Sequence, residues 1–236
     1  MKIFTAITAA SILGFTVIPI QNNQVVQFDI SKILNARPVT TLTGGRLITW
    51  KKGIDGNGIG DGYLTVSAAL FNGDKEAHAL PDDPVFAANA SHPEIKLHYS
   101  NKDSLHYQAC AISGLEEVEF KVPEAKYKDV YLALTSAEGA SILDVRLVYA
   151  DGSEEKDLTL PDYFWDVKPD DPNVCYLAHD LAKWGPKNNM TEKDHHNIHL
   201  LNIHPDPARR LDRISISKTK ATYLVLWAAA GVKAAG

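Results

Sequence analysis

A period-two alternation of apolar and polar residues between positions 142 and 160 constrains the fold more than any other feature. In the segment ILDVRLVYADGSEEKDLTLPD, every second residue of the first arm is apolar: Leu143, Val145, Leu147 and Tyr149. Asp151 and Gly152 follow, a pair that readily adopts the positive φ angles of a two-residue hairpin turn. Leu158 and Leu160 continue the alternation on the return arm. The segment therefore predicts a β-hairpin with one buried face.

Strand-like patterns recur along most of the remaining chain. They are found in EEVEFKVP (116–123), KDVYLALTSAEG (128–139), LDRISISK (211–218) and ATYLVLWAAAG (221–231). Turn-forming residues separate such segments at about the 8–12-residue spacing of all-β sandwiches. The last segment is apolar on both faces, which predicts a central strand with Trp227 in the core.

These patterns predict an all-β fold in which two antiparallel sheets stack as a β-sandwich. Two long loops are expected, over residues 51–83 and 161–196. Only residues 177–184 suggest a helix, and that helix would be short. The chain has 236 residues and no linker or repeat, so we expect a single domain over residues 22–236.

Composition narrows the classes of partner. The sequence is 45% hydrophobic and 22% charged, which supplies a core and argues against disorder. Its net charge of −5 leaves no basic footprint for nucleic acid. No basic amphipathic segment predicts binding to a membrane surface.

The N-terminal sequence MKIFTAITAASILGFTVIPIQNNQ has the form of a secretion signal. A lysine precedes an apolar stretch from Ile3 to Ile20, and polar residues follow. We expect residues 1–21 to be removed and the mature protein to be secreted or periplasmic. A membrane anchor and a buried first segment are the alternatives, although no second segment is long and apolar enough to span a bilayer.

The chain has two cysteines, Cys110 and Cys175, in apolar strand-like segments. In an oxidising compartment they could form a disulfide, and two buried free thiols are the equal alternative. No pair of cysteines has zinc-ligand or redox spacing.

The order of segments resembles a known domain type. YKDVYLALTSAEGASILDVRLVYADGSEEKDLTLPDYF, then HLLNIHPDPARRLDRISISK, then YLVLWAAAGV is similar to the galactose-binding-like, carbohydrate-binding-module type of β-sandwich in secreted bacterial carbohydrate-active proteins. The resemblance covers most of the mature chain and is weaker in the front half, especially over residues 77–101. It implies a jelly-roll sandwich that binds sugars through its loops. It also implies that such a domain is usually appended to a glycoside hydrolase or a lyase.

The segment DHHNIHLLNIHPDP (194–207) concentrates histidines, and two structures compete for it. His195 and His199 have the i, i+4 spacing of a helical zinc site, but no glutamate lies between them and Asn197 disfavours a helix. In a strand the same two residues would lie about 13 Å apart, too far for one metal ion. The apolar residues that follow favour the strand, with His195 and His196 at its mouth and a structural or ligand-lining role.

The segment GIDGNGIGDGYLT offers hard oxygen ligands in a glycine-rich loop. Asp55, Asn57 and Asp61 are residue types that calcium prefers, although their spacing is not that of an EF-hand. We therefore hypothesise a structural calcium ion here, with a surface turn as the simpler alternative.

Aromatic residues suggest where a sugar would bind. Tyr163, Phe164 and Trp165 occur in PDYFWDV, and Trp184 occurs in LAKWGPKNN. Sugars stack their C–H faces on rings and pair their hydroxyls with polar groups, and long loops commonly hold such sites. The predicted ligand-binding residues are Tyr163, Trp165, Asp166, Trp184, Asn188, His195 and His196. Phe164 is expected to plug the core, and either tryptophan could instead anchor its segment.

Catalysis has less support. No G-x-S-x-G motif marks a serine nucleophile. The carboxylates of residues 162–171 could serve glycoside hydrolysis, and His196, Tyr163 and Arg209 could serve a lyase, but the sequence does not single them out. We therefore expect a secreted, non-catalytic carbohydrate-binding β-sandwich. A polysaccharide lyase or glycoside hydrolase using the histidine-rich segment is the alternative, and a domain that contacts another protein is a third.

Overall fold

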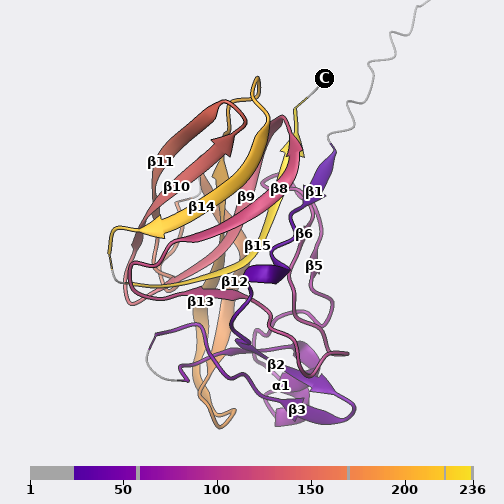
Figure 1. The fold of residues 1–236 in the computed structure, drawn as a ribbon. Helices are drawn as coiled ribbons and strands as arrows, with labels where there is room; N and C mark the ends of the chain where they lie inside the picture. The colour runs from indigo at the N-terminus through magenta and orange to yellow at the C-terminus, as the bar shows by residue number, and fades with distance from the viewer. Residues whose placement is uncertain (1–23, 57–58, 169–170, 221, 235–236) are drawn as a thin grey trace, which may run out of the picture.

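The computed structural model describes residues 24–56, 59–168, 171–220 and 222–234 (Figure 1). The predicted secretion signal and the predicted calcium ligand Asn57 lie outside these residues. The described chain is all-β apart from one 3-10 turn, η1 (Ser31–Ile33), and one short helix, α1 (Val66–Asn72). No helix among the described residues has the length and apolar character required to cross a membrane.

The larger sheet has six strands, and all its pairings are antiparallel. Five of them follow the order β1-β15-β9-β13-β12, and β7 also pairs with β15. Their bounds are β1 (Val25–Gln27), β7 (Cys110–Ile112), β9 (Tyr127–Ala137), β12 (Val174–Trp184), β13 (Met190–Ile203) and β15 (Tyr223–Lys233). As predicted for residues 221–231, β15 is central, and the Trp227 side chain is fully buried.

The second sheet has four strands in the order β11-β10-β14-β8. They are β8 (Val118–Ala125), β10 (Ser141–Tyr149), β11 (Gly152–Leu160) and β14 (Leu211–Lys218). The predicted hairpin is confirmed, because Tyr149 pairs with Gly152 and β10 stays in register with β11 to Ser141. Leu143, Val145 and Leu147 are fully buried, as the alternation requires.

The two sheets share one of the hydrophobic cores. Leu147 of β10 and Ile214 of β14 contribute from the four-stranded sheet, and Leu132 of β9 and Leu201 of β13 contribute from the six-stranded sheet. Cys110 is buried in this core, whereas Cys175 is half-buried on β12, and both are free thiols.

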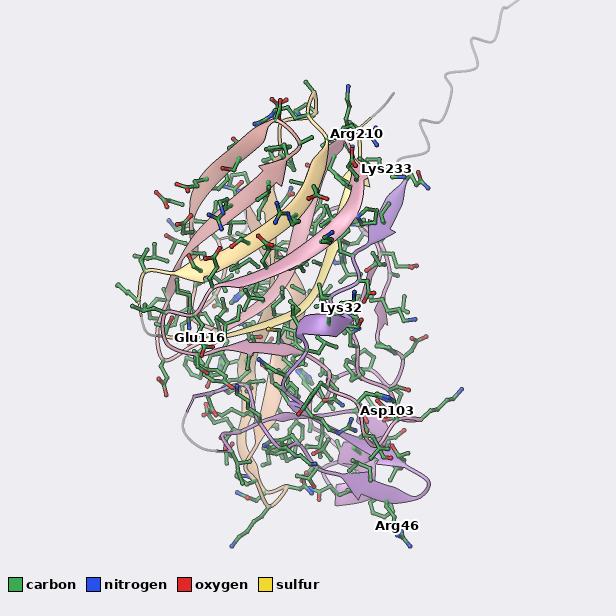
Figure 2. All side chains as sticks on the ribbon, viewed as in Figure 1. Lys32, Arg46, Asp103, Glu116, Arg210 and Lys233 are labelled. Atoms are coloured by element: carbon green, nitrogen blue, oxygen red, sulfur yellow. The ribbon has the colours of Figure 1, made fainter. Side chains whose placement is uncertain are left out.

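The opposite face of the six-stranded sheet has a cover of short elements, which we call the irregular cover (the described residues of 36–109). Its elements are β2 (Val39–Thr43), β3 (Arg46–Ile48), β4 (Tyr63–Leu64), α1, β5 (Val85–Phe86) and β6 (Ile95–Lys96). Tyr63 of β4 stacks on Trp227, with ring centroids 5.9 Å apart. Figure 2 places Arg46 and Asp103 of this cover at the end of the molecule away from Arg210 and Lys233.

Two predictions about loops are wrong. Residues 161–196 contain β12 and the first half of β13 rather than one long loop, and residues 177–184 form strand rather than helix. The alternation is obscured because the β12–β13 register shifts repeatedly and because Asp180 and His195 have φ angles of 55° and 73°. In residues 51–83, where a loop is predicted, α1 forms and ends at Gly73 in the left-handed conformation.

Candidate functional site

A pocket of about 470 Å³ lies where the β12–β13 hairpin meets the irregular cover. Five carboxylates line it: Asp55, Asp61, Glu138, Asp162 and Glu192. The side chains of Tyr163, Phe164 and His196 complete most of the remaining wall. Of the residues predicted from sequence, the pocket thus brings together Tyr163 and His196 with the two described members of the calcium hypothesis, Asp55 and Asp61.

The strand β13 positions Glu192 and His196. The histidine segment is a strand, as predicted, but His195 bulges from it with a φ of 73°. Glu192 pairs with Lys183 and His196 pairs with Leu181. Between these two pairs, β13 has three residues where β12 has one. The bulge leaves His195 exposed at the rim and turns His196 inward, where it is fully buried.

Lys183 of β12 is the cation beneath this pocket. Its Nζ donates to Glu192 Oε1 at 2.8 Å and to the Tyr163 hydroxyl at 3.2 Å. The same ammonium lies 3.6 Å from Asp55 Oδ2 and 3.5 Å from Asp61 Oδ2. Burial lowers the pKa of Lys183, but the hydrogen bonds and charges of Glu192 and Tyr163 together outweigh it, and the pKa lies above its ordinary value. Lys183 therefore stays charged at neutral pH and holds the loop of Asp55 and Asp61 against β12.

The calcium hypothesis stays a prediction, because its ligand Asn57 lies outside the described residues. Calcium takes about six to eight oxygen ligands, whereas Asp55 and Asp61 share the Lys183 ammonium. Asp55 Oδ1 also accepts from the Asp61 backbone N–H at 2.6 Å, which closes the loop. Within the described residues, no group of three acidic, histidine or cysteine side chains is arranged to hold a metal ion.

His196 presents an unpaired nitrogen to the pocket. Its Nδ1 lies 3.2 Å from the Leu181 carbonyl, to which a protonated Nδ1 donates. Its Nε2 is buried, lies 3.4 Å from Glu192 Oε2 and makes no hydrogen bond within the described residues. Burial and then the charge of Lys183 lower the pKa of His196, while Glu192 opposes them. A neutral imidazole with its Nε2 lone pair toward Glu192 follows from these contacts.

Phe164 corrects the sequence prediction. It was expected to plug the core, but its side chain is 47% exposed at the pocket. Its ring lies 5.5 Å from the ring of His195 and 5.6 Å from that of His196. Asp162 holds this turn in place, because Oδ1 accepts from the Phe164 N–H at 2.9 Å and Oδ2 accepts from the Gly139 N–H at 2.7 Å.

The other predicted ligand residues lie elsewhere. Trp165 is 55% exposed outside the pocket, and Asp166 lies near Tyr176 and His179. Trp184 is fully buried, and its Nε1 donates to Asp74 Oδ2 at 2.7 Å, so its ring faces are covered by protein. Trp184 thus takes the anchoring position that was its alternative.

Asn188 packs in the same region as Trp184. It has a φ of 56°, and its side chain reaches Thr40 and Thr49 of the irregular cover. The predicted site is therefore divided, with Tyr163 and His196 at the pocket, His195 at its rim, and Trp184 and Asn188 joining β12 and β13 to the cover.

Sequence reasoning missed Lys183, Glu192 and Glu138. Lys183 is an isolated lysine in an apolar context, and Glu192 occurs in a polar run typical of a solvated segment. The four-residue spacing of Glu192 and His196 was the one feature of the sequence that could have indicated their proximity. Residues four apart on an unbulged strand share a face.

Comparisons with known proteins add little to this geometry. No protein-family model matches the sequence, and no curated protein matches it. Among solved structures, the chain is similar to the catalytic unit of a thermostable GH87 α-1,3-glucanase from Streptomyces thermodiastaticus strain HF3-3, with a TM-score of 0.34 and 16% identity. The match covers 55% of this chain and 20% of the glucanase unit, and at that TM-score it carries no argument about function.

Proposed function

We propose that this protein is a non-catalytic carbohydrate-binding domain of the galactose-binding-like, jelly-roll type, and that the pocket beside Phe164 receives the sugar. The observation that carries the proposal is the pocket wall, where a half-exposed aromatic ring stands beside Asp162, Glu192 and His196. Such a wall matches a sugar, whose C–H face packs on a ring while its hydroxyls bond to polar groups.

The size and rigidity of the pocket support the same function. A volume of about 470 Å³ lies within the usual range for small-ligand sites and admits one or two sugar rings. Lys183 and Asp162 fix the surrounding segments through charge-assisted hydrogen bonds, so little ordering is needed on binding. The ligand remains open to solvent on one side, and we expect weak affinity.

The sequence supports the wider assignment. The resemblance to carbohydrate-binding-module sandwiches and the predicted secretion signal both fit a protein that meets polysaccharide outside the cytoplasm. The stacking of a four-stranded on a six-stranded antiparallel sheet is compatible with that architecture.

Calorimetric titration with a panel of soluble oligosaccharides tests the proposal. Phe164→Ala should weaken sugar binding about tenfold, because one stacked ring contributes on the order of 1–2 kcal/mol. Phe71→Ala is the matched control, since Phe71 is 58% exposed on α1, and it should leave affinity unchanged. Equal affinities for wild type and Phe164→Ala would place the sugar elsewhere.

A glycoside hydrolase is the second candidate, because carboxylates of separate segments converge on one cation. Glu192, Asp55 and Asp61 all lie within 4 Å of Lys183 Nζ, and a pair of carboxylates is what glycoside hydrolysis uses. A reducing-end assay on the sugars that bind separates the two functions. New chain ends that disappear in Glu192→Gln would establish the enzyme, and binding without new ends supports the binding domain.

A further inference from the structure

The wall of the pocket has a strong excess of negative charge. Leaving Glu138 aside, four carboxylates line it, and the cation in contact with three of them is Lys183, which is 7% exposed beneath the surface. His196 adds no charge at neutral pH, because burial and Lys183 lower its pKa. Carboxylates in such a concave site attract cations and repel anions.

The hydrogen-bonding groups that the wall offers to a ligand are mainly acceptors. Lys183 directs its donors at Glu192 and Tyr163, inside the protein. His196 Nε2 and Glu192 Oε2 face each other at 3.4 Å, and with Nδ1 donating to Leu181 both are acceptors. His196 is fully buried and its Nε2 makes no hydrogen bond within the described residues, so a donor from a ligand would satisfy it.

We propose that the pocket selects a sugar that carries a free amino group, bound as its ammonium ion between Glu192 and His196. The inference rests on the proposed function and names the class of sugar. An ammonium group has three donors and no acceptor, which complements a wall of carboxylates and an imidazole lone pair. Phe164 strengthens the same choice, because an aromatic face attracts a nearby cation as well as the sugar ring.

The same wall discriminates against other sugars. N-acetylation removes the positive charge and replaces three donors by one, so an N-acetyl sugar loses the charge-assisted bonds. A uronic acid brings a carboxylate against the carboxylates already present and is rejected by repulsion.

The experiment is calorimetric titration of the wild-type chain with three oligosaccharides of equal length: glucosamine oligomers, their fully N-acetylated counterparts, and uronate oligomers. Measurements at pH 6 keep the amine charged, and a second series at high salt screens the carboxylates. We expect glucosamine oligomers to bind about tenfold more tightly than the N-acetylated form, a preference that shrinks in high salt. Uronate oligomers should show no measurable binding.

The possible results separate the two proposals. Equal binding of the amine and N-acetyl forms, or preferred binding of uronate, overturns the amino-sugar inference and leaves carbohydrate binding standing. Absence of binding to all three oligomers and to a wider neutral panel overturns both.

A variant tests whether Glu192 provides the selectivity for the amine. Glu192→Gln keeps the size of the side chain and removes its charge, so the amine preference should fall toward one while the affinity for the N-acetyl form changes less than about twofold. Asp157→Asn is the control, because Asp157 is an exposed carboxylate on β11 of the other sheet. Equal weakening of both sugars in Glu192→Gln would contradict the ammonium contact.

Discussion

The two faces of the six-stranded sheet are covered in different ways. On one face, the strands of the four-stranded sheet are 8 or 9 residues long, and β10 pairs with β11 along its whole length. On the other face, the strands of the irregular cover are 2 to 5 residues long. Side chains replace part of the missing backbone pairing there. Gln108, for example, accepts from the Val39 N–H at 2.8 Å and donates to the Val39 carbonyl at 3.2 Å.

The difference shows where buried polar groups can be placed. A regular sheet satisfies most of its own backbone, and the buried polar residues of the four-stranded sheet are Ser141, Ser215 and Lys218. An irregular cover must bury polar side chains to satisfy its backbone, as Arg37 does by donating to the carbonyls of Asp103 and His106. The candidate site forms along the second kind of cover, where Lys183 and His196 are also buried.

The largest expected effect tests whether both covers belong to one cooperative unit. Trp227→Ala removes a fully buried ring that stacks on Tyr63 and donates to Thr135 Oγ1 at 2.8 Å, and it should lower the free energy of unfolding by about 4 kcal/mol. Leu147→Ala, on the other face, should cost about 3 kcal/mol. Urea unfolding followed by circular dichroism and by fluorescence should give one coincident transition for each variant. Two separate transitions in Trp227→Ala would show that the irregular cover unfolds by itself.

His199 gives the next effect, which depends on pH. Burial lowers its pKa from the ordinary 6.5 to about 4, so the unfolded chain binds a proton between these values while the folded chain does not. Stability is therefore lost as the pH falls through this window, by about 2–3 kcal/mol for this one group.

His199→Leu is the variant that measures this contribution. Unfolding free energies at pH 7 and pH 4.5 should differ less in His199→Leu than in wild type by that amount. Some dependence will remain, because burial also lowers the pKa values of His98 and His196. An unchanged pH dependence would contradict the assignment to His199.

A smaller effect compares a buried cation with an exposed one. Lys183→Met leaves Glu192, Asp55 and Asp61 without their shared ammonium and should cost about 2 kcal/mol, below the usual range for buried pairs because Glu192 is 41% exposed. Lys156→Met, which breaks a pair with Glu154 on β11 in which both side chains are 32% exposed, should cost less than about 0.5 kcal/mol. If urea unfolding showed the same loss of unfolding free energy for Lys183→Met and Lys156→Met, the distinction between the buried and the more exposed cation would be wrong.

The smallest effect on stability is expected at the pocket rim. Phe164→Ala should change the free energy of unfolding by less than about 0.5 kcal/mol, because the ring is half-exposed and packs mainly on His195 and His196. A loss as large as that of Leu147→Ala would return Phe164 to the structural role expected from sequence.

The four-stranded sheet was predictable where its strands keep the period of two, most clearly in β10 and β11. The β10–β11 hairpin follows from Leu143 to Leu160 and from the Asp151-Gly152 turn, and it appears as expected. The pairing of β12 with β13 was missed because bulges shift the period, most visibly at His195. In the irregular cover, tertiary contacts decide the structure, and strands of two residues leave no period to detect.

The candidate site was predicted only in part. Tyr163 and His196 were chosen for their chemistry, and they do meet at one pocket, with ring centroids 4.8 Å apart. Trp184 was chosen for the same reason but is turned into a small core with Trp50, which the sequence does not encode locally. Lys183 acquires its importance only from partners brought in by the fold.

The hydrogen bond from Trp184 to Asp74 joins residues 110 positions apart, and the backbones of Trp184 and Gly62 also exchange hydrogen bonds. Synthesis on the ribosome completes Asp55, Asp61 and Asp74 well before β12. Their contacts with Lys183 and Trp184 can form only after β12 has been made. A truncated chain that stops before residue 174 would hold the acidic loop without its lysine, so the pocket cannot form until β12 and β13 have been synthesised.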